Sequence, residues 1–224
     1  MKRPARPGKG GMLAALLVSS AAIFADGERA PALRLDVHAF QVIEQVSGNY
    51  SYYRIIEDPA EPFVRALYRP GAEPVTIGLE IPDGWRRGTK RLRWRWRAMA
   101  LPKGADECES GKADSAAALV LTWKSGFRYY SVKHAWTTQG ARGRVCNGRR
   151  GIFIVHDTKV LRAGGPVGEW FDEEVDPDAE FRKQFRDDDP DADVPDLVGL
   201  SLLSDGHETG SVSGADYTAF ALLR

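Results

Sequence analysis

Apolar and polar residues alternate along most of the chain, in short runs that Gly, Pro, Asp and Asn interrupt. The clearest run is RLRWRWRAM (residues 91–99), where arginines alternate with one leucine and two tryptophans. A period of two, together with many β-branched and aromatic residues, predicts β-strands. The predicted strands cover residues 40–46, 52–56, 63–68, 75–81, 91–99, 117–123, 128–136, 151–161, 197–203 and 217–223.

One segment has the pattern of a helix, DPDAEFRKQF (residues 176–185). Asp176 is a suitable N-cap, Pro177 suits the first turn, and Phe181 and Phe185 lie four residues apart on one face. About ten strands with one short helix, and no alternation of strands with helices, predict an all-β fold, an antiparallel β-sandwich. No repeat or long linker divides the chain, so we expect a single domain over residues 32–224.

The run at residues 91–99 separates its apolar and basic side chains onto two faces of a strand. Leu92, Trp94 and Trp96 share one face, which we expect to lie in the core, and Arg93 and Arg95 share the other. The arginines either pair with carboxylates of neighbouring strands or form a surface that binds an anion or a glycan. Single-stranded nucleic acid is disfavoured because alternation separates the aromatic from the basic side chains.

Charge is balanced overall but unevenly distributed. The 224 residues carry 31 Lys and Arg and 31 Asp and Glu, and this zero net charge disfavours a dedicated nucleic-acid binder. Residues 86–150 hold 16 basic and 4 acidic residues, a net of +12, whereas residues 166–210 hold 15 acidic and 3 basic residues, a net of −12. We therefore expect the two blocks to neutralise each other in the folded protein.

The N-terminus resembles a secretory signal. A basic segment without acids is followed by an apolar or small stretch, residues 12–25, which is too short for a membrane-spanning helix. We predict a signal peptide over residues 1–25, cleaved after Ala22 or Ala25, and export to the periplasm or the medium. An uncleaved membrane anchor is the alternative, and we expect no stable membrane insertion after processing.

Export determines how the two cysteines, Cys108 and Cys146, are interpreted. In an oxidising compartment a single pair most simply forms one disulfide. Two free thiols are the alternative. Zinc is disfavoured because there is no Cys-x-x-Cys and the four histidines are scattered.

Two segments approach the pattern of a catalytic motif, and each lacks a required feature. GKAD at Gly111 lacks the spacing of a phosphate-binding loop, and GSVSG at Gly210 has Val212 where a nucleophile elbow needs serine. We therefore assign no catalytic residue.

The acidic run RDDDPDADVPD places aspartates at alternate positions, the kind of oxygen cluster that calcium prefers. It lacks the glycine and the glutamate of an EF-hand loop, so we interpret it as a solvated loop. No cofactor is predicted, with calcium as the open alternative.

Several segments together resemble the exported bacterial family of unknown function DUF3047. They are FQVIEQV, RLRWRWRAMALPKGAD, DSAAALVLTW, GEWFDEEVDPDAEFRKQF and DGHETGSVSGADYTAFALL, and they span nearly all of the chain after the signal. The resemblance implies a jelly-roll sandwich like those of galactose-binding and carbohydrate-binding modules, and no established activity. Near the end, Asp205, His207 and Thr209 stand where the family tends to have Asp-x-Asp-x-Thr.

Two functional hypotheses follow. The first is a non-catalytic module that binds a glycan or a small polar ligand, with Arg93, Arg95 and Asp205 as candidate ligand-binding residues. The alternative is a hydrolase of envelope or extracellular glycans that uses carboxylates of the acidic block. Two carboxylates about 5–10 Å apart in one cleft would favour hydrolysis.

Overall fold

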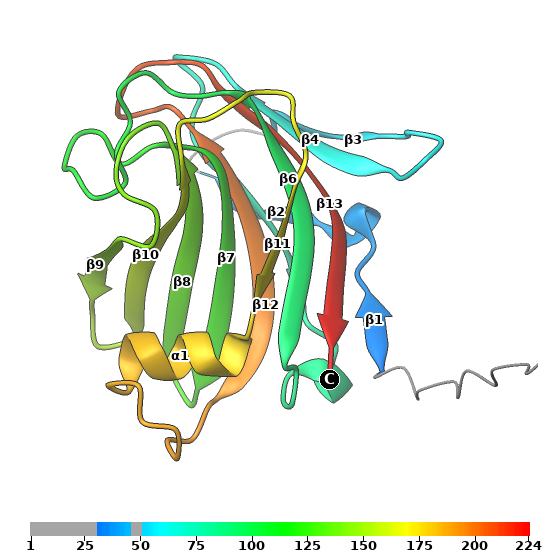
Figure 1. Cartoon of the computed structure of the whole chain (residues 1–224), viewed down its shortest axis with the longest axis vertical. Helices are drawn as coiled ribbons and strands as arrows, with labels where there is room; N and C mark the ends of the chain where they lie inside the picture. Colours follow the sequence, from blue (N-terminus) through cyan, green and yellow to red (C-terminus); the bar gives the residue numbers. More distant parts are fainter. Residues whose placement is uncertain (1–30, 46–50) are drawn as a thin grey trace, which may run out of the picture.

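The computed structural model describes residues 31–45 and 51–224, and it consists of two β-sheets packed face to face (Figure 1). The predicted signal peptide, residues 1–25, lies outside the described residues. The first sheet, sheet A, contains in order β11 (Phe171–Val175), β6 (Arg91–Ala100), β13 (Ser213–Leu223), β4 (Phe63–Tyr68) and β3 (Tyr53–Ile56), with β1 (Ala32–Arg34) also pairing with β13. The second, sheet B, contains β2 (Gln41–Gln45), β5 (Val75–Glu80), β12 (Asp196–Asp205), β7 (Ser115–Ser125), β8 (Arg128–Thr137), β10 (Ile154–Ala163) and β9 (Val145–Arg150).

The predicted β-sandwich is confirmed, and each predicted run contains a strand. Three strands were not predicted, namely β1, β9 and β11. The expectation of purely antiparallel pairing is wrong at one place, because β10 runs parallel to β8. After β8 the chain returns along the sheet edge as β9 and then turns into β10, which pairs with both neighbours.

Three short helices complete the described structure: η1 (Val37–Ala39), η2 (Asp83–Trp85) and α1 (Pro177–Phe185). The predicted cap of α1 is confirmed, since the Asp176 carboxylate accepts hydrogen bonds from the N–H groups of Asp178 and Ala179. Phe181 is fully buried, with its ring centre 5.5 Å from that of Trp123 on β7. The helix therefore closes the lower end of the sandwich across sheet B (Figure 1).

Tryptophans from both sheets form the centre of the core. Trp94 and Trp96 of β6 are 1% and 0% exposed, which confirms the predicted faces of this strand. Trp96 packs on Trp136 of β8 with ring centres 5.9 Å apart. The apolar half of the alternating run therefore joins the two sheets.

The predicted disulfide is present. Cys108, in the loop before β7, is bonded to Cys146 of β9, and their Cα atoms lie 5.4 Å apart. The bond ties this loop to the edge of sheet B. Within the part of the chain that the structure describes, no helix is long and apolar enough to cross a membrane.

Candidate functional site

The arginines of β6 face acids of the neighbouring strands, as the charge distribution predicted. The register places Glu174 of β11 opposite Arg93 and Asp172 opposite Arg95. Arg93 donates to Glu174, and Arg95 Nε lies 3.1 Å from Asp172 Oδ1. These two ion pairs are largely exposed, so they supply complementary charge rather than much stability.

A more deeply buried ion-pair cluster lies two residues further along β6, at Arg97. Asp216 of β13 stands opposite both Arg97 of β6 and Arg65 of β4. Its fully buried carboxylate accepts from Arg65 at 2.8 Å through both oxygens, and from Arg97 at 2.7 Å. The Trp170 ring covers this cluster, 4.5 Å from the Arg97 guanidinium carbon. This end of the arginine face is therefore occupied by the protein's own side chains.

The structure does not bring the three candidate ligand-binding residues together. Arg93 and Arg95 line a groove of about 390 Å³ on the outer face of sheet A, over Ala219 and Ala221 of β13. Asp205 lies at the end of β12 in sheet B, where burial raises the pKa of its carboxyl and its oxygen accepts the His207 N–H at 2.8 Å. Asp205 therefore stabilises the turn that follows β12, away from Arg93 and Arg95.

The groove on sheet A also bears on the hydrolase hypothesis. Asp172 and Glu174 both line it, and two residues along a strand correspond to about 7 Å. That separation is within the glycosidase range. Each carboxylate, however, is already engaged by an arginine of β6. These contacts favour a role in charge pairing.

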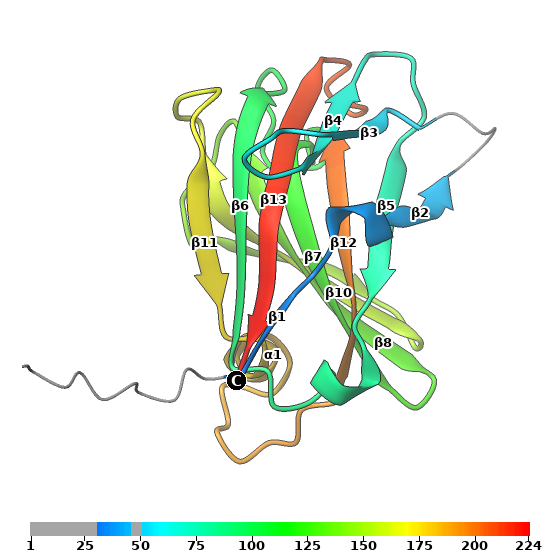
Figure 2. The ribbon, with the colours of Figure 1, turned by 90° about the vertical axis from the view of Figure 1, so that its right-hand side faces the viewer.

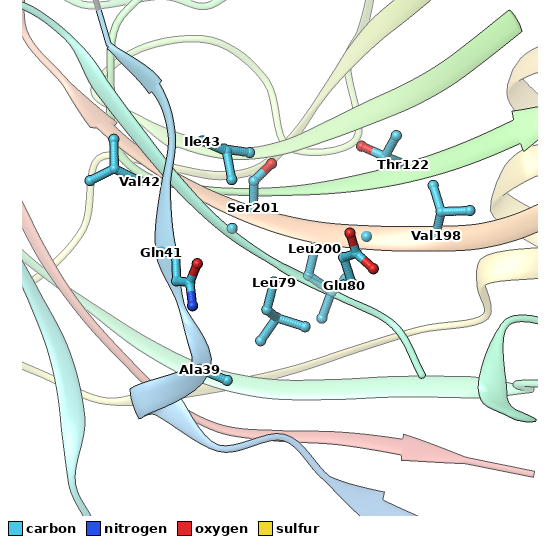
Figure 3. A pocket seen from close by; sticks show the side chains of 12 residues that line it. Ala39, Gln41, Val42, Ile43, Leu79, Glu80, Thr122, Val198, Leu200 and Ser201 are labelled. Carbon is cyan, nitrogen blue, oxygen red and sulfur yellow. The ribbon is translucent and has the colours of Figure 1, made fainter. Parts of the chain in front are cut away.

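A larger groove, of about 500 Å³, crosses the outer face of sheet B (Figure 3). Polar groups line it, namely the Gln41 amide, the Glu80 carboxylate and the Thr122 and Ser201 hydroxyls. Val42 and Ile43 of the edge strand β2 supply exposed aliphatic surface, and Figure 3 shows Ile43 beside Ser201. The groove thus combines hydrogen-bonding groups with apolar walls.

Glycines create the space for this groove. A Cβ on Gly78 would lie 2.8 Å from Ile43 Cδ1 and 3.0 Å from the Leu200 carbonyl oxygen, so a side chain there would displace its neighbours. A Cβ on Gly199 would meet only the Leu79 carbonyl oxygen, at 3.4 Å. The floor is therefore open at Gly199, and the missing side chain of Gly78 makes room for Ile43.

Polar side chains continue beyond the groove along the same row of the sheet. Glu80, Gly199, Thr122, Ser131 and His156 are successive cross-strand partners. The row crosses five strands, and four strand spacings correspond to about 19 Å. The outer face of sheet B therefore carries polar side chains of β5, β7, β8 and β10 in line with the groove.

The far end of this row carries a neutral histidine. The Ser131 hydroxyl lies 2.8 Å from His156 Nδ1. Burial, together with the positive charge of Lys133, lowers the pKa of His156 to about 4. Lys133 is itself paired with Glu107 at 2.6 Å. At neutral pH the imidazole is therefore an uncharged hydrogen-bonding group, and its low basicity makes it a poor general base for Ser131.

Comparison with known proteins places the chain in a family. The family model described as "Protein of unknown function (DUF3047)" matches residues 53–221. The chain belongs to the DUF3047 family. A search of the curated proteins finds no match for this DUF3047 chain.

Solved structures resemble the DUF3047 chain only distantly. A family 11 carbohydrate-binding module from Clostridium thermocellum, in complex with a mixed-linked tetrasaccharide, has a TM-score of 0.46 at 8% identity, covering 86% of this chain and 95% of that one. The family 11 module of the cellulosomal cellulase Lic26A-Cel5E from the same organism has a TM-score of 0.46 at 10% identity, covering 87% and 95%. The xyloglucanase domain of NopAA from Sinorhizobium fredii has a TM-score of 0.43 at 8% identity, covering 86% and 95%.

Sequence reasoning missed the groove of this DUF3047 chain. Gly78 and Gly199 interrupt two predicted strands, and a glycine inside a strand marks a place where something approaches the backbone closely. That signal was available, but the pairing of β5 with β12 was not. In the described residues no group of three or more His, Cys, Asp or Glu side chains is placed to hold a metal ion.

Proposed function

We propose that this protein is a non-catalytic module that binds a glycan, or another small polar ligand rich in hydroxyl groups, along the outer groove of sheet B. The observation that carries the proposal is the glycine-floored groove of about 500 Å³ between the polar side chains of β5, β7 and β12 and the aliphatic side chains of β2. Ligand sites of this size combine apolar walls with a few placed polar groups.

The chemistry of the lining matches a sugar. Gln41 both donates and accepts hydrogen bonds, Glu80 accepts them, and Thr122 does both. Such groups suit the hydroxyls of a pyranose, and the side chains of Val42 and Ile43 suit its C–H faces. Glu80 is the one ionisable side chain among the described residues that line the groove, and the Arg86 guanidinium lies 3.7 Å from its carboxylate, which favours an uncharged ligand.

The test is glycan-array screening of the full chain, with and without calcium, followed by calorimetry on the glycans that bind. Gly199→Leu fills the groove where a Cβ is tolerated, and Glu80→Gln removes the charged acceptor. Gly199→Leu should weaken binding about tenfold or more because its side chain occupies the groove. Glu80→Gln should weaken binding by a similar factor, since a hydrogen bond to a charged group contributes about 1.5–3 kcal/mol. Their controls are Gly84→Leu and Glu73→Gln, at positions outside the groove with open space or solvent around them.

The same assay compares this groove with the arginine face. If Arg93→Ala and Arg95→Ala weaken binding while Gly199→Leu does not, the ligand lies on sheet A and the present assignment is wrong. If no glycan binds to the wild-type chain, the proposed function itself fails.

A further inference from the structure

The most exposed apolar side chains of the described residues lie together on two neighbouring turns. Phe127, in the turn between β7 and β8, is 88% exposed, and Ile152 and Phe153, in the turn between β9 and β10, are 82% and 63% exposed. The two turns are joined, because the Tyr129 N–H donates to the Phe153 carbonyl at 2.7 Å. We call Phe127, Ile152 and Phe153 the turn patch.

Basic residues flank the turn patch. Residues 124–131 and 147–154 contain Lys124, Arg128, Arg149 and Arg150 and no acid. Arg150 pairs with Asp157 at 2.6 Å. The other three form no ion pair with any residue in the described ranges. Exposed apolar side chains therefore stand beside three basic side chains that form no ion pair within the described ranges.

The acidic segment of the chain does not supply the missing partner. Asp187, Asp188 and Asp189 follow α1 and are exposed. Figure 2 shows the segment after α1 below the helix at the bottom of the view, with the turn between β7 and β8 to its right. Because no ion pair among the described residues joins this segment to Lys124, Arg128 or Arg149, these three side chains are available to an external negative surface.

We propose that the turn patch docks the protein reversibly on an anionic phospholipid membrane. An anionic lipid surface complements both the turn patch and the basic residues that flank it. Its acyl layer accepts a few protruding apolar side chains, and its phosphates pair with the arginines around them. The patch is small and lies on two turn tips, so it suits a deformable surface better than a broad protein interface. Only the tips enter the interfacial layer.

The experiment is co-sedimentation of the full chain with vesicles of phosphatidylcholine alone or mixed with phosphatidylglycerol, at low and high salt. The wild-type chain should bind the phosphatidylglycerol vesicles and release them as salt rises. A triple variant, Phe127→Ser with Ile152→Ser and Phe153→Ser, should bind at least about tenfold less. Arg128→Gln with Arg149→Gln should reduce binding about thirtyfold, from about 1 kcal/mol for each basic residue near an anionic surface.

The matched control is Val212→Ser, which removes an apolar side chain that is 40% exposed at the start of the β13 region. It should bind vesicles as the wild-type chain does, and all variants should keep the wild-type melting temperature because the replaced side chains are exposed. These results together support the proposal.

Two results would overturn it. The wild-type chain could fail to bind either vesicle. Vesicle binding could persist in the triple variant, which would place the lipid contact elsewhere in the chain, including residues 12–25. In that second case, the triple variant could also lose self-association in light scattering, or glycan binding. The patch would then serve a second copy or the glycan groove.

Discussion

Replacing Asp216 by alanine tests whether strand register sets the strength of the ion pairs on sheet A. The carboxylate is 0% exposed and holds Arg65 and Arg97, which are 37% and 21% exposed. Asp216→Ala leaves two partly buried guanidinium groups without a counter-charge. Removing one partner of a buried ion pair costs about 3–5 kcal/mol.

The matched control is Asp172→Ala on the same face. Asp172 is 79% exposed and its partner Arg95 is 40% exposed. An exposed pair of this kind contributes about 0–1 kcal/mol. The same chemical change is thus expected to differ severalfold in cost between two strands that flank β6, because the Asp216 carboxylate is buried whereas the Asp172 carboxylate is exposed.

The assay is urea denaturation at neutral pH, monitored by tryptophan fluorescence. For a chain of this size, 1 kcal/mol corresponds to about 2–4 °C, so Asp216→Ala should also melt about 6–20 °C lower than the wild-type protein. Asp216→Asn keeps the volume and some hydrogen bonds, and it should fall between the wild-type protein and Asp216→Ala.

Equal costs for Asp216→Ala and Asp172→Ala would refute the reasoning. A cost below about 1 kcal/mol for Asp216→Ala would do so as well, since the pair would then behave as an exposed one. A double-mutant cycle with Arg97→Ala separates the coupling of the pair from the cost of leaving a charge unpaired.

The remaining predictions concern the bridge, a histidine and the core. Reducing the Cys108–Cys146 bond, which closes 38 residues, should lower stability by about 4 kcal/mol, and unreduced protein should show no free thiol in a thiol titration. His156 has a folded pKa of about 4 against an ordinary 6.5, so the unfolded chain binds the proton first and stability should fall as pH drops from 6.5 to 4. His156→Gln should flatten that part of the pH–stability curve, and an unchanged slope would contradict the assignment. Trp96→Ala should cost about 3–5 kcal/mol in a denaturant titration because the indole is fully buried, and a cost below about 1 kcal/mol would place it outside the core.

Local pattern alone located most strands and the helix. Alternation fixed which face of residues 91–99 is buried, because successive side chains on a strand point to opposite sides whatever the partners are. The cap at Asp176 is equally local, since it satisfies N–H groups two and three residues away. Strand β11 escaped prediction because its sequence, Phe-Asp-Glu-Glu-Val, has acidic residues that strands usually avoid.

What the sequence alone determined was the sandwich, the tryptophan core, the single cysteine pair and the presence of two opposite charge blocks. Which acid meets which arginine was decided by tertiary structure, because the register of β6 with β11 and β13 joins residues far apart in the chain. The groove on sheet B also depends on the tertiary structure. Gly78 and Gly199 are separate glycines in the sequence, and they form one floor only because β5 and β12 lie side by side. Long-range pairing of this kind is not contained in any local pattern, since it depends on how the whole chain closes its core.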